Sequence, residues 1–215
     1  MMASLLRGFL GGLVVAAIVV PCARATEPPA IELFNGKDLT GWKQAGPGAF
    51  EVKDGELRTV GGMGLLWYAP QQFAYFTLTL EYKNVRAQDN SGVFTRFSDP
   101  ANDPWKPVKE TEEVQIQDSA GLKGTGSVYN VREATEVAAK PPDEWNSMQI
   151  TIVGRKYTVI LNCKLVNEFE SAKVPLQGYV GLQNHDPDSK IAFRNVKLVE
   201  LKTAEAATQP APKSP

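Results

Sequence analysis

Residues 113–118 read Glu-Val-Gln-Ile-Gln-Asp, a run in which polar and β-branched apolar side chains alternate. Successive side chains of a β-strand point to opposite faces of its sheet. Val114 and Ile116 would therefore enter a core, while Glu113 and Gln115 would share the other face. A carboxylate is a candidate base or metal ligand, and a primary amide offers both a hydrogen-bond donor and an acceptor. This face is either an ordinary wet surface or the floor of a polar site.

His185 is the only histidine of the chain, and it follows an alternating run that carries Gln183. The unperturbed pKa of histidine suits proton transfer or metal ligation. Glu113 and His185 would give a mixed oxygen and nitrogen site for a divalent metal, although no dense spacing such as His-x-x-x-His occurs. The alternatives are a loop histidine without a role and an exposed strand glutamate.

Arg96 lies in a predicted strand with Phe94, and its guanidinium could stabilise an oxyanion or hold hydroxyls by paired hydrogen bonds. The alternative is a surface arginine whose stem covers an apolar neighbour. Asp118 ends its run before Ser-Ala-Gly, where we favour capping of the turn over catalysis.

Alternating runs like 113–118 recur along the chain and are rich in β-branched and aromatic residues. The predicted strands are 50–53, 56–59, 65–68, 75–83, 91–97, 148–152, 157–161, 180–183 and 191–201. Asp54-Gly55, Gly154-Arg155 and Asn162-Cys163 are predicted hairpin turns, and glycine would suit position 163 better than cysteine. Ten to twelve such strands indicate a β-sandwich or a barrel. Strand order and the path of the loop 99–112 are not predicted.

Residues 1–25 have the features of a secretory signal peptide cleaved after Ala25. Arg7 supplies the positive n-region, and 9–20 is an apolar stretch too short for an ordinary membrane span. The alternatives are an uncleaved anchor helix and a lipoprotein signal at Cys22, which the preceding residues fit poorly. The signal peptide predicts a periplasmic or secreted protein without stable membrane insertion after cleavage.

The predicted mature chain keeps one cysteine, Cys163, so no internal disulfide can form. It carries 21 bases against 24 acids, and this weakly acidic charge without a basic stripe argues against nucleic-acid binding. We expect a short linker at 26–30, one domain at 31–202 and a disordered tail at 203–215, because the tail lacks large apolar residues.

Seven fragments occur in a specific order along this domain. They are 33–42 (Leu-Phe-Asn-Gly-Lys-Asp-Leu-Thr-Gly-Trp), 52–57 (Val-Lys-Asp-Gly-Glu-Leu), 90–96 (Asn-Ser-Gly-Val-Phe-Thr-Arg), 113–116 with Asp118, Trp145-Asn146, Gly181-Leu182-Gln183 and 193–196 (Phe-Arg-Asn-Val). Together they resemble the 3-keto-disaccharide hydrolase domain family, whose members are described as 3-keto-glucoside 1,2-lyases and 3-keto-2-hydroxy-glucal hydratases. The resemblance covers nearly the whole predicted domain. It implies an all-β jelly-roll sandwich of the concanavalin A-like lectin and glucanase type, with sugar bound on a concave sheet.

The resemblance implies a reaction on a glucoside already oxidised at C3 by a separate oxidoreductase. The ketone acidifies the C2 proton, so a base can start elimination of the C1 substituent, and hydration of the resulting glucal completes a net hydrolysis. This route needs a base, stabilisation of the C3 oxygen and a proton source, without the paired carboxylates of ordinary glycosidases.

On this interpretation the candidate residues have two roles. Glu113, His185 and Arg96 are the catalytic candidates, with Glu113 and His185 as candidate ligands of a divalent metal. Gln115 and Gln183 would bind sugar hydroxyls, and Trp67 and Tyr129 would stack on the ring.

Two features of the resemblance limit these assignments. Family members often have His-Gly where this chain has His185-Asp186, which puts the local backbone in question. Trp42 and Trp145 fall in the resembling fragments and are expected in the core.

A non-catalytic carbohydrate-binding module remains the alternative function, because fold alone does not settle function. A classical glucanase ranks last. The acidic pair near the candidate residues, Glu112 and Glu113, would face opposite sides of a strand.

Overall fold

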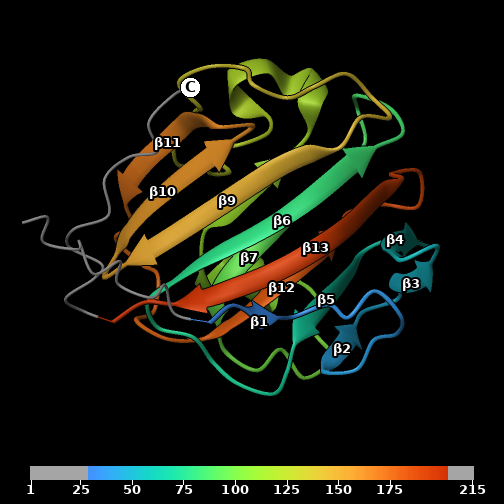
Figure 1. Ribbon diagram of the computed structural model, residues 1–215, viewed down its shortest axis with the longest axis horizontal. Helices are drawn as coiled ribbons and strands as arrows, with labels where there is room; N and C mark the ends of the chain where they lie inside the picture. The colour runs from blue at the N-terminus through green and yellow to red at the C-terminus, as the bar shows by residue number, and fades with distance from the viewer. Residues whose placement is uncertain (1–28, 203–215) are drawn as a thin grey trace, which may run out of the picture.

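Two antiparallel β-sheets pack face to face in the computed structural model, which describes residues 29–202 (Figure 1). The eight-stranded sheet has the order β11-β10-β9-β6-β13-β4-β3, and β1 pairs with β13. Its strands are β1 (Ile31–Glu32), β3 (Ala49–Lys53), β4 (Glu56–Val60), β6 (Phe76–Asn84), β9 (Asn146–Val153), β10 (Lys156–Leu161), β11 (Lys164–Glu170) and β13 (Ile191–Glu200). The five-stranded sheet has the order β2-β5-β12-β7-β8. Its strands are β2 (Trp42–Ala45), β5 (Gly64–Tyr68), β7 (Ser91–Phe97), β8 (Glu113–Ile116) and β12 (Tyr179–Asn184).

The main core fills the space between the two sheets, as the alternating patterns predicted. The eight-stranded sheet contributes one face of β6 and β9, including Leu78, Tyr82 and Ile150. The five-stranded sheet contributes the alternate residues of β7 and β8, including Val93 and Val114. Each large apolar side chain removed from water stabilises the fold by roughly 1.5–3 kcal/mol. The predicted all-β sandwich is confirmed.

The three predicted hairpin turns are also confirmed. Asp54 and Gly55 join β3 to β4 with φ of 55° and 78°. Asn162 and Cys163 join β10 to β11 with φ of 50° and 66°, so the cysteine occupies a left-handed position that favours glycine. Gly154 lies in the turn between β9 and β10.

A second, smaller apolar cluster lies on the outer face of the five-stranded sheet. Its buried members are Ala45, Leu65, Trp67, Phe94 and Phe97. The loop whose path the sequence did not predict contains the short helix α1 (Lys106–Glu110), and Val108 of this helix packs against the cluster. This face is therefore partly covered and apolar rather than uniformly polar.

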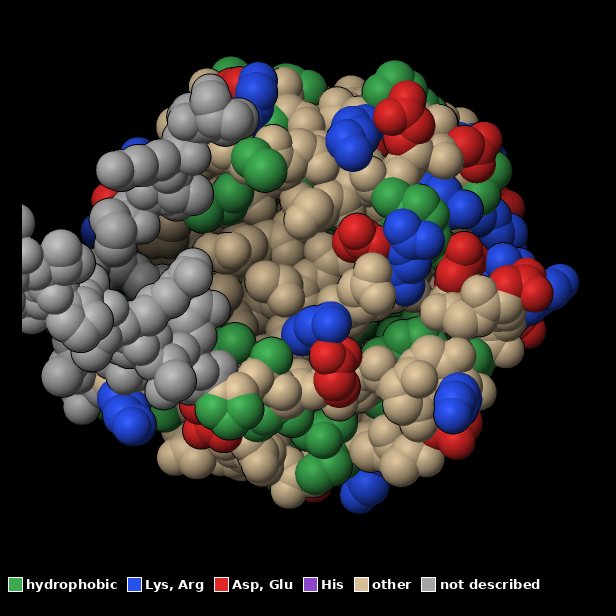
Figure 2. Space-filling model, in the orientation of Figure 1, with side chains coloured by type: hydrophobic (Ala, Val, Ile, Leu, Met, Phe, Trp, Pro, Cys, Tyr) green, Lys and Arg blue, Asp and Glu red, His purple; other side chains and the backbone are tan. Residues whose placement is uncertain are grey.

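The two tryptophans expected in the core differ in position. Trp42 is buried, and its indole N–H donates to the Leu33 carbonyl at 2.6 Å. The expectation for Trp145 was wrong, because it lies partly exposed beside Lys83 and Arg194, with cation–ring distances of 4.8 and 4.0 Å. Both cations follow a core residue on their strand, Tyr82 or Phe193, so they project from the outer face of the eight-stranded sheet. Figure 2 views this face, on which charged side chains gather toward the side of β3 and β4.

The predicted signal peptide 1–25 and the predicted tail 203–215 lie outside the described residues and stay predictions. Across residues 29–202, no helix has both the length and the apolar character needed to cross a bilayer.

Candidate functional site

Strand pairing brings three of the predicted residues to the outer face of the five-stranded sheet. Val114 and Leu182 enter the main core, so their strand neighbours Glu113, Gln115 and Gln183 face the other way. Gln115 pairs with Gly92 across β7 and β8, while β12 lies on the other side of β7. All three residues are nearly buried, so they form a floor rather than a wet surface. Glu113 and Gln115 each line a cavity beside this floor, whereas Gln183 lines neither cavity.

The Glu113 carboxyl lies directly over Gly92, and a side chain at position 92 would collide with it. A Cβ built on Gly92 would come within 2.1 Å of Glu113 Oε1. Glu113 is 7% exposed and makes no side-chain hydrogen bond or ion pair with any described residue. Burial of this isolated carboxyl disfavours its charged form and raises its pKa to about 8. The group is thus a carboxyl tuned toward neutral-pH proton transfer.

Two cavities open beside this floor and share a wall made by residues 129–131. The smaller, about 250 Å³, is lined by Val108, Thr111, Glu113, Tyr129, Asn130, Val131 and Lys173. The larger, about 420 Å³, is lined by Gln115, Gln117, Ala120, Lys123, Ser127, Val128, Tyr129, Asn130, Val131, Arg132 and Glu133. Tyr129, 49% exposed, is therefore accessible to a ligand in either cavity.

The shared wall is held in place by the edge of β8. Gln115 N–H donates to the Ser127 carbonyl at 3.0 Å, and Tyr129 N–H donates to the Glu113 carbonyl at 3.0 Å. Val128 in turn forms an isolated bridge with Arg132. Residues 126–132 thus continue the sheet at its edge and carry Tyr129 next to Glu113.

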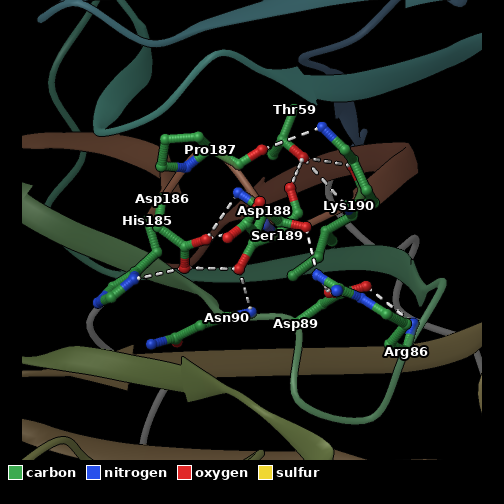
Figure 3. A network of polar contacts seen from close by, with 11 residues as sticks. Thr59, Arg86, Asp89, Asn90, His185, Asp186, Pro187, Asp188, Ser189 and Lys190 are labelled. Atoms are coloured by element: carbon green, nitrogen blue, oxygen red, sulfur yellow. Dashed lines mark hydrogen bonds and ion pairs between the residues drawn. The ribbon is translucent and has the colours of Figure 1, made fainter.

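His185 connects to this floor through a line of polar contacts, part of which Figure 3 shows. Its Nδ1 lies 2.9 Å from Asp186 Oδ2, which also accepts the Ser189 hydroxyl at 2.7 Å. Ser189 Oγ accepts the Asn90 N–H at 2.9 Å, and Asn90 Oδ1 accepts Gln115 Nε2 at 2.8 Å. The last contact orients the Gln115 amide.

Asp186 organises the turn between β12 and β13 with its carboxylate. Its burial opposes ionisation, but hydrogen bonds from His185, Ser189 and the Asp188 backbone together lower its pKa to about 2. The ionised Asp186 side chain therefore fixes the backbone between β12 and β13 without a glycine. His185 lies at the exposed end of the network and lines neither cavity beside Glu113.

Arg96 is not part of this face, which corrects its assignment as a catalytic group. The ladder between β7 and β12 shifts between Tyr179 and Val180, and Arg96 is the extra residue, with φ of 59°. Its buried guanidinium donates to the carbonyls of Ala74 and Gly154. The prediction assumed unbroken alternation, whereas the bulge turns Arg96 toward backbone carbonyls.

Trp67 lies in the apolar cluster rather than presenting an open stacking surface. It is 2% exposed, with Tyr179 edge-on at 4.8 Å and Lys43 Nζ 5.5 Å from the ring centre. Trp67 Nε1 and Gln183 Oε1 are both buried without a protein hydrogen-bond partner. These two atoms leave one donor and one acceptor unsatisfied near the floor.

Asp118 has a structural position, although not the simple cap that was expected. Its carboxylate accepts hydrogen bonds from Tyr82, Asn84 and Thr125, at 3.1, 3.0 and 2.5 Å. It thereby ties β6 to the 3-10 helix η1 (Asp118–Lys123).

The donor set fits a protein-held metal poorly. Within the described part of the chain, no group of three or more His, Cys, Asp or Glu side chains could hold an ion. An ion at Glu113 would take most of its ligands from water or substrate, as magnesium often does. The metal site at Glu113 and His185 stays a prediction, and no step below depends on it.

Sequence reasoning missed the cations and amides that come from loops. Lys173 and Asn130 reach the Glu113 cavity, and Lys123 and Arg132 reach the larger one. Alternation carries no information about loop residues, so only the fold could place them.

Comparison with known proteins identifies the family of the chain. Residues 29–199 match the family model described as the 3-keto-alpha-glucoside-1,2-lyase-like domain. Two crystal structures from Parabacteroides distasonis ATCC 8503, of candidate glycosyl hydrolases, share 22% and 27% identity with TM-scores of 0.69 and 0.67. Each covers 80% of this chain, and the alignments span 94% and 100% of those chains.

More distant structures share the fold alone. The carbohydrate-binding module CBM66 from Bacillus subtilis is 16% identical with a TM-score of 0.53, covering 74% of this chain and 96% of its own. A Bacillus licheniformis β-glucanase is 12% identical with a TM-score of 0.55, covering 83% and 100%. Comparison with curated proteins gives no match. The sandwich is thus a carbohydrate-active, glycosyl hydrolase-like domain, and the chain belongs to the 3-keto-alpha-glucoside-1,2-lyase-like domain family.

Proposed function

We propose that this protein cleaves 3-keto-glucosides by removing the C2 proton and eliminating the C1 substituent, followed by hydration of the glucal. The observation that carries the proposal is Glu113, a buried and unpaired carboxyl facing a cavity, with a pKa raised to about 8. General bases work best when their pKa lies near the operating pH.

The surroundings of Glu113 favour elimination over ordinary glycoside hydrolysis. Glycosidases commonly place two carboxyl groups about 5–10 Å apart across the scissile bond. Among residues 29–202, Glu113 is the only acid that lines its cavity. Glu133 in the neighbouring cavity lies 3.9 Å from Lys123. Glu112 turns away and accepts the Ser171 hydroxyl at 2.7 Å. One proton-transfer group suits a substrate whose ketone already activates C2.

The proposed elimination balances as follows. The Glu113 carboxylate takes the C2 proton, and the electron pair of the C2–H bond delocalises onto the C3 oxygen as an enolate. The enolate reforms the ketone, a double bond forms between C1 and C2, and the C1–oxygen bond breaks. The leaving oxygen takes a proton from the Glu113 carboxylic acid, so the residue returns to its starting state. Addition of water across the double bond then gives 3-keto-glucose.

The remaining floor residues bind and orient the sugar. The Gln115 amide nitrogen is engaged by Asn90, so its oxygen is the group that remains to accept a sugar hydroxyl. Gln183 Oε1 is buried and the residue lines neither cavity, so its sugar-binding role stays a prediction. Tyr129 supplies an aromatic surface next to Glu113. A separate oxidoreductase would supply the ketone, in the periplasm or outside the cell.

The test uses the full chain with a nitrophenyl 3-keto-glucoside and the matching unoxidised glucoside. We expect nitrophenol release from the keto substrate alone and deuterium at C2 of the product in D₂O. The value of kcat/KM should rise with pH and level off above about pH 8, because the base acts when ionised. Glu113→Gln should lower kcat by about 10²–10⁴-fold. Absence of release from the keto substrate, with or without added divalent metals, would refute the proposal.

A non-catalytic carbohydrate-binding role is the second candidate, favoured by the likeness of the fold to CBM66. It predicts calorimetric binding of glucosides without turnover. Equal binding of keto and unoxidised sugars with no product would support this role.

A further inference from the structure

The proposed reaction develops negative charge on the C3 oxygen, and that charge needs a fixed positive partner. Preorganised donors aimed at developing charge are among the largest contributions to catalysis. Arg96 cannot serve, because its guanidinium is buried against backbone carbonyls. The cavity of Glu113 contains one cationic side chain, that of Lys173.

Lys173 reaches this cavity from the segment that follows β11. Its side chain is 48% exposed, while its ammonium lies 3.2 Å from Glu112 Oε2. Ammonium has three donors, so this ion pair leaves others free for a ligand. The side chain thus combines a held charge with access to the Glu113 cavity.

The partner that holds Lys173 is itself firmly fixed. Glu112 is 4% exposed, and its Oε1 accepts the Ser171 hydroxyl at 2.7 Å. Ser171 Oγ also accepts the backbone N–H groups of Lys173 and Val174, at 3.2 and 3.0 Å. The segment and the carboxylate are therefore tied together, which restricts the position of the lysine.

The adjacent acids Glu112 and Glu113 consequently have divided tasks. Their side chains point in opposite directions. Glu113 lines the cavity, whereas Glu112 contacts Ser171 and Lys173. Glu113 and Lys173 line the same cavity, and no ion pair joins them. One ligand in this cavity could therefore contact both the carboxyl and the lysine.

We propose that Lys173, positioned by Glu112, stabilises the enolate oxygen at C3 when Glu113 removes the C2 proton. This inference rests on the proposed lyase function and adds an electrophilic residue to it. Lys173 would be a catalytic residue that contacts the substrate, and Glu112 a positioning residue that acts through it. No bond is made to Lys173, and its proton stays in place throughout.

The test compares the full chain with Lys173→Met, Lys173→Arg and Glu112→Gln, using the nitrophenyl 3-keto-glucoside. Loss of one such donor should lower kcat by about 10²–10³-fold with little change in KM. Lys173→Arg should restore part of the rate, and Glu112→Gln should give an intermediate loss. The control is Lys156→Met, which removes a half-exposed lysine paired with Glu168 at 3.0 Å on the opposite sheet.

A second measurement does not depend on turnover. In ¹³C-lysine-labelled protein, the Lys173 Cε signal, assigned by its loss in Lys173→Met, should shift on addition of 3-keto-glucose. The control signal of Lys156 should stay in place. Together these readouts separate the role of Lys173 from simple support of the fold.

The outcomes distinguish this inference from the proposed function. Wild-type turnover with unchanged kcat in Lys173→Met, or a change in KM alone, would overturn the role of Lys173 and leave the lyase function intact. Binding that shifts the Lys173 signal without turnover would overturn both the lyase function and the electrostatic role. A result with no turnover and no shift of the Lys173 signal would also reject the lyase function and the role of Lys173.

Discussion

Replacement of Glu113 by glutamine should stabilise the protein at high pH while strongly lowering the proposed activity. The carboxyl is buried without an ion pair, and burial raises its pKa from the ordinary value of 4.5 to about 8. Between these two pH values, Glu113 keeps its proton in the folded state but has released it in the unfolded state. Stability therefore falls as pH rises from about 4.5 to about 8, and the amide escapes this loss.

The magnitude follows from linkage at about 1.4 kcal/mol per pH unit. The loss of unfolding free energy caused by the Glu113 carboxyl grows from about 1 kcal/mol near pH 5 to at most about 5 kcal/mol near pH 9. The stability difference between Glu113→Gln and wild type should thus increase by about 4 kcal/mol across this range. Any constant difference in packing of the amide cancels in this comparison.

Urea unfolding followed by tryptophan fluorescence at several pH values measures this difference directly. The matched control is Glu112→Gln, one residue away, whose carboxylate is held by Ser171 and Lys173. That variant should lose stability, because it removes the buried charge that lies beside Lys173 and accepts the Ser171 hydroxyl. Parallel pH profiles for wild type and Glu113→Gln would show that the Glu113 carboxyl is well solvated, and the argument for it as a neutral-pH base would fail.

Three further changes test other parts of the structure. Arg96→Met should destabilise the fold by about 3–5 kcal/mol in urea unfolding, because it leaves buried carbonyls without their donor; wild-type stability would refute the structural role. Cys163→Gly should raise stability by roughly 0.5–1 kcal/mol, since the residue has φ of 66°, and a loss in urea unfolding would contradict this. Asn90→Ala should raise KM about tenfold with little change in kcat, by losing about 1.4 kcal/mol of oriented binding through Gln115; a loss confined to kcat would argue against positioning.

Much of the architecture could be predicted because it depends on local rules. Alternation in 76–82 and 148–152 separates two chemical environments, and a strand delivers them to opposite faces. Asp54-Gly55 and Asn162-Cys163 occupy turns that require positive φ, a constraint that acts within a few residues. The same local rule placed Glu113 and Gln115 on one face and Val114 in the core.

The cavity itself was decided by contacts between residues far apart in the sequence. The bulge at Arg96 is a feature of the pairing between β7 and β12. It turns the Arg96 side chain, a predicted catalytic group, into the interior. The wall at Tyr129 and the ammonium of Lys173 meet Glu113 because separate loops converge on the edge of β8.

The sequence by itself therefore determined which residues share a strand face and where the chain turns, since these follow from backbone geometry over a few positions. Only the tertiary structure decided that Glu113 is buried without a partner and that Lys173 shares its cavity. Desolvation and charge placement depend on every segment packed around a group, and no local pattern contains that information.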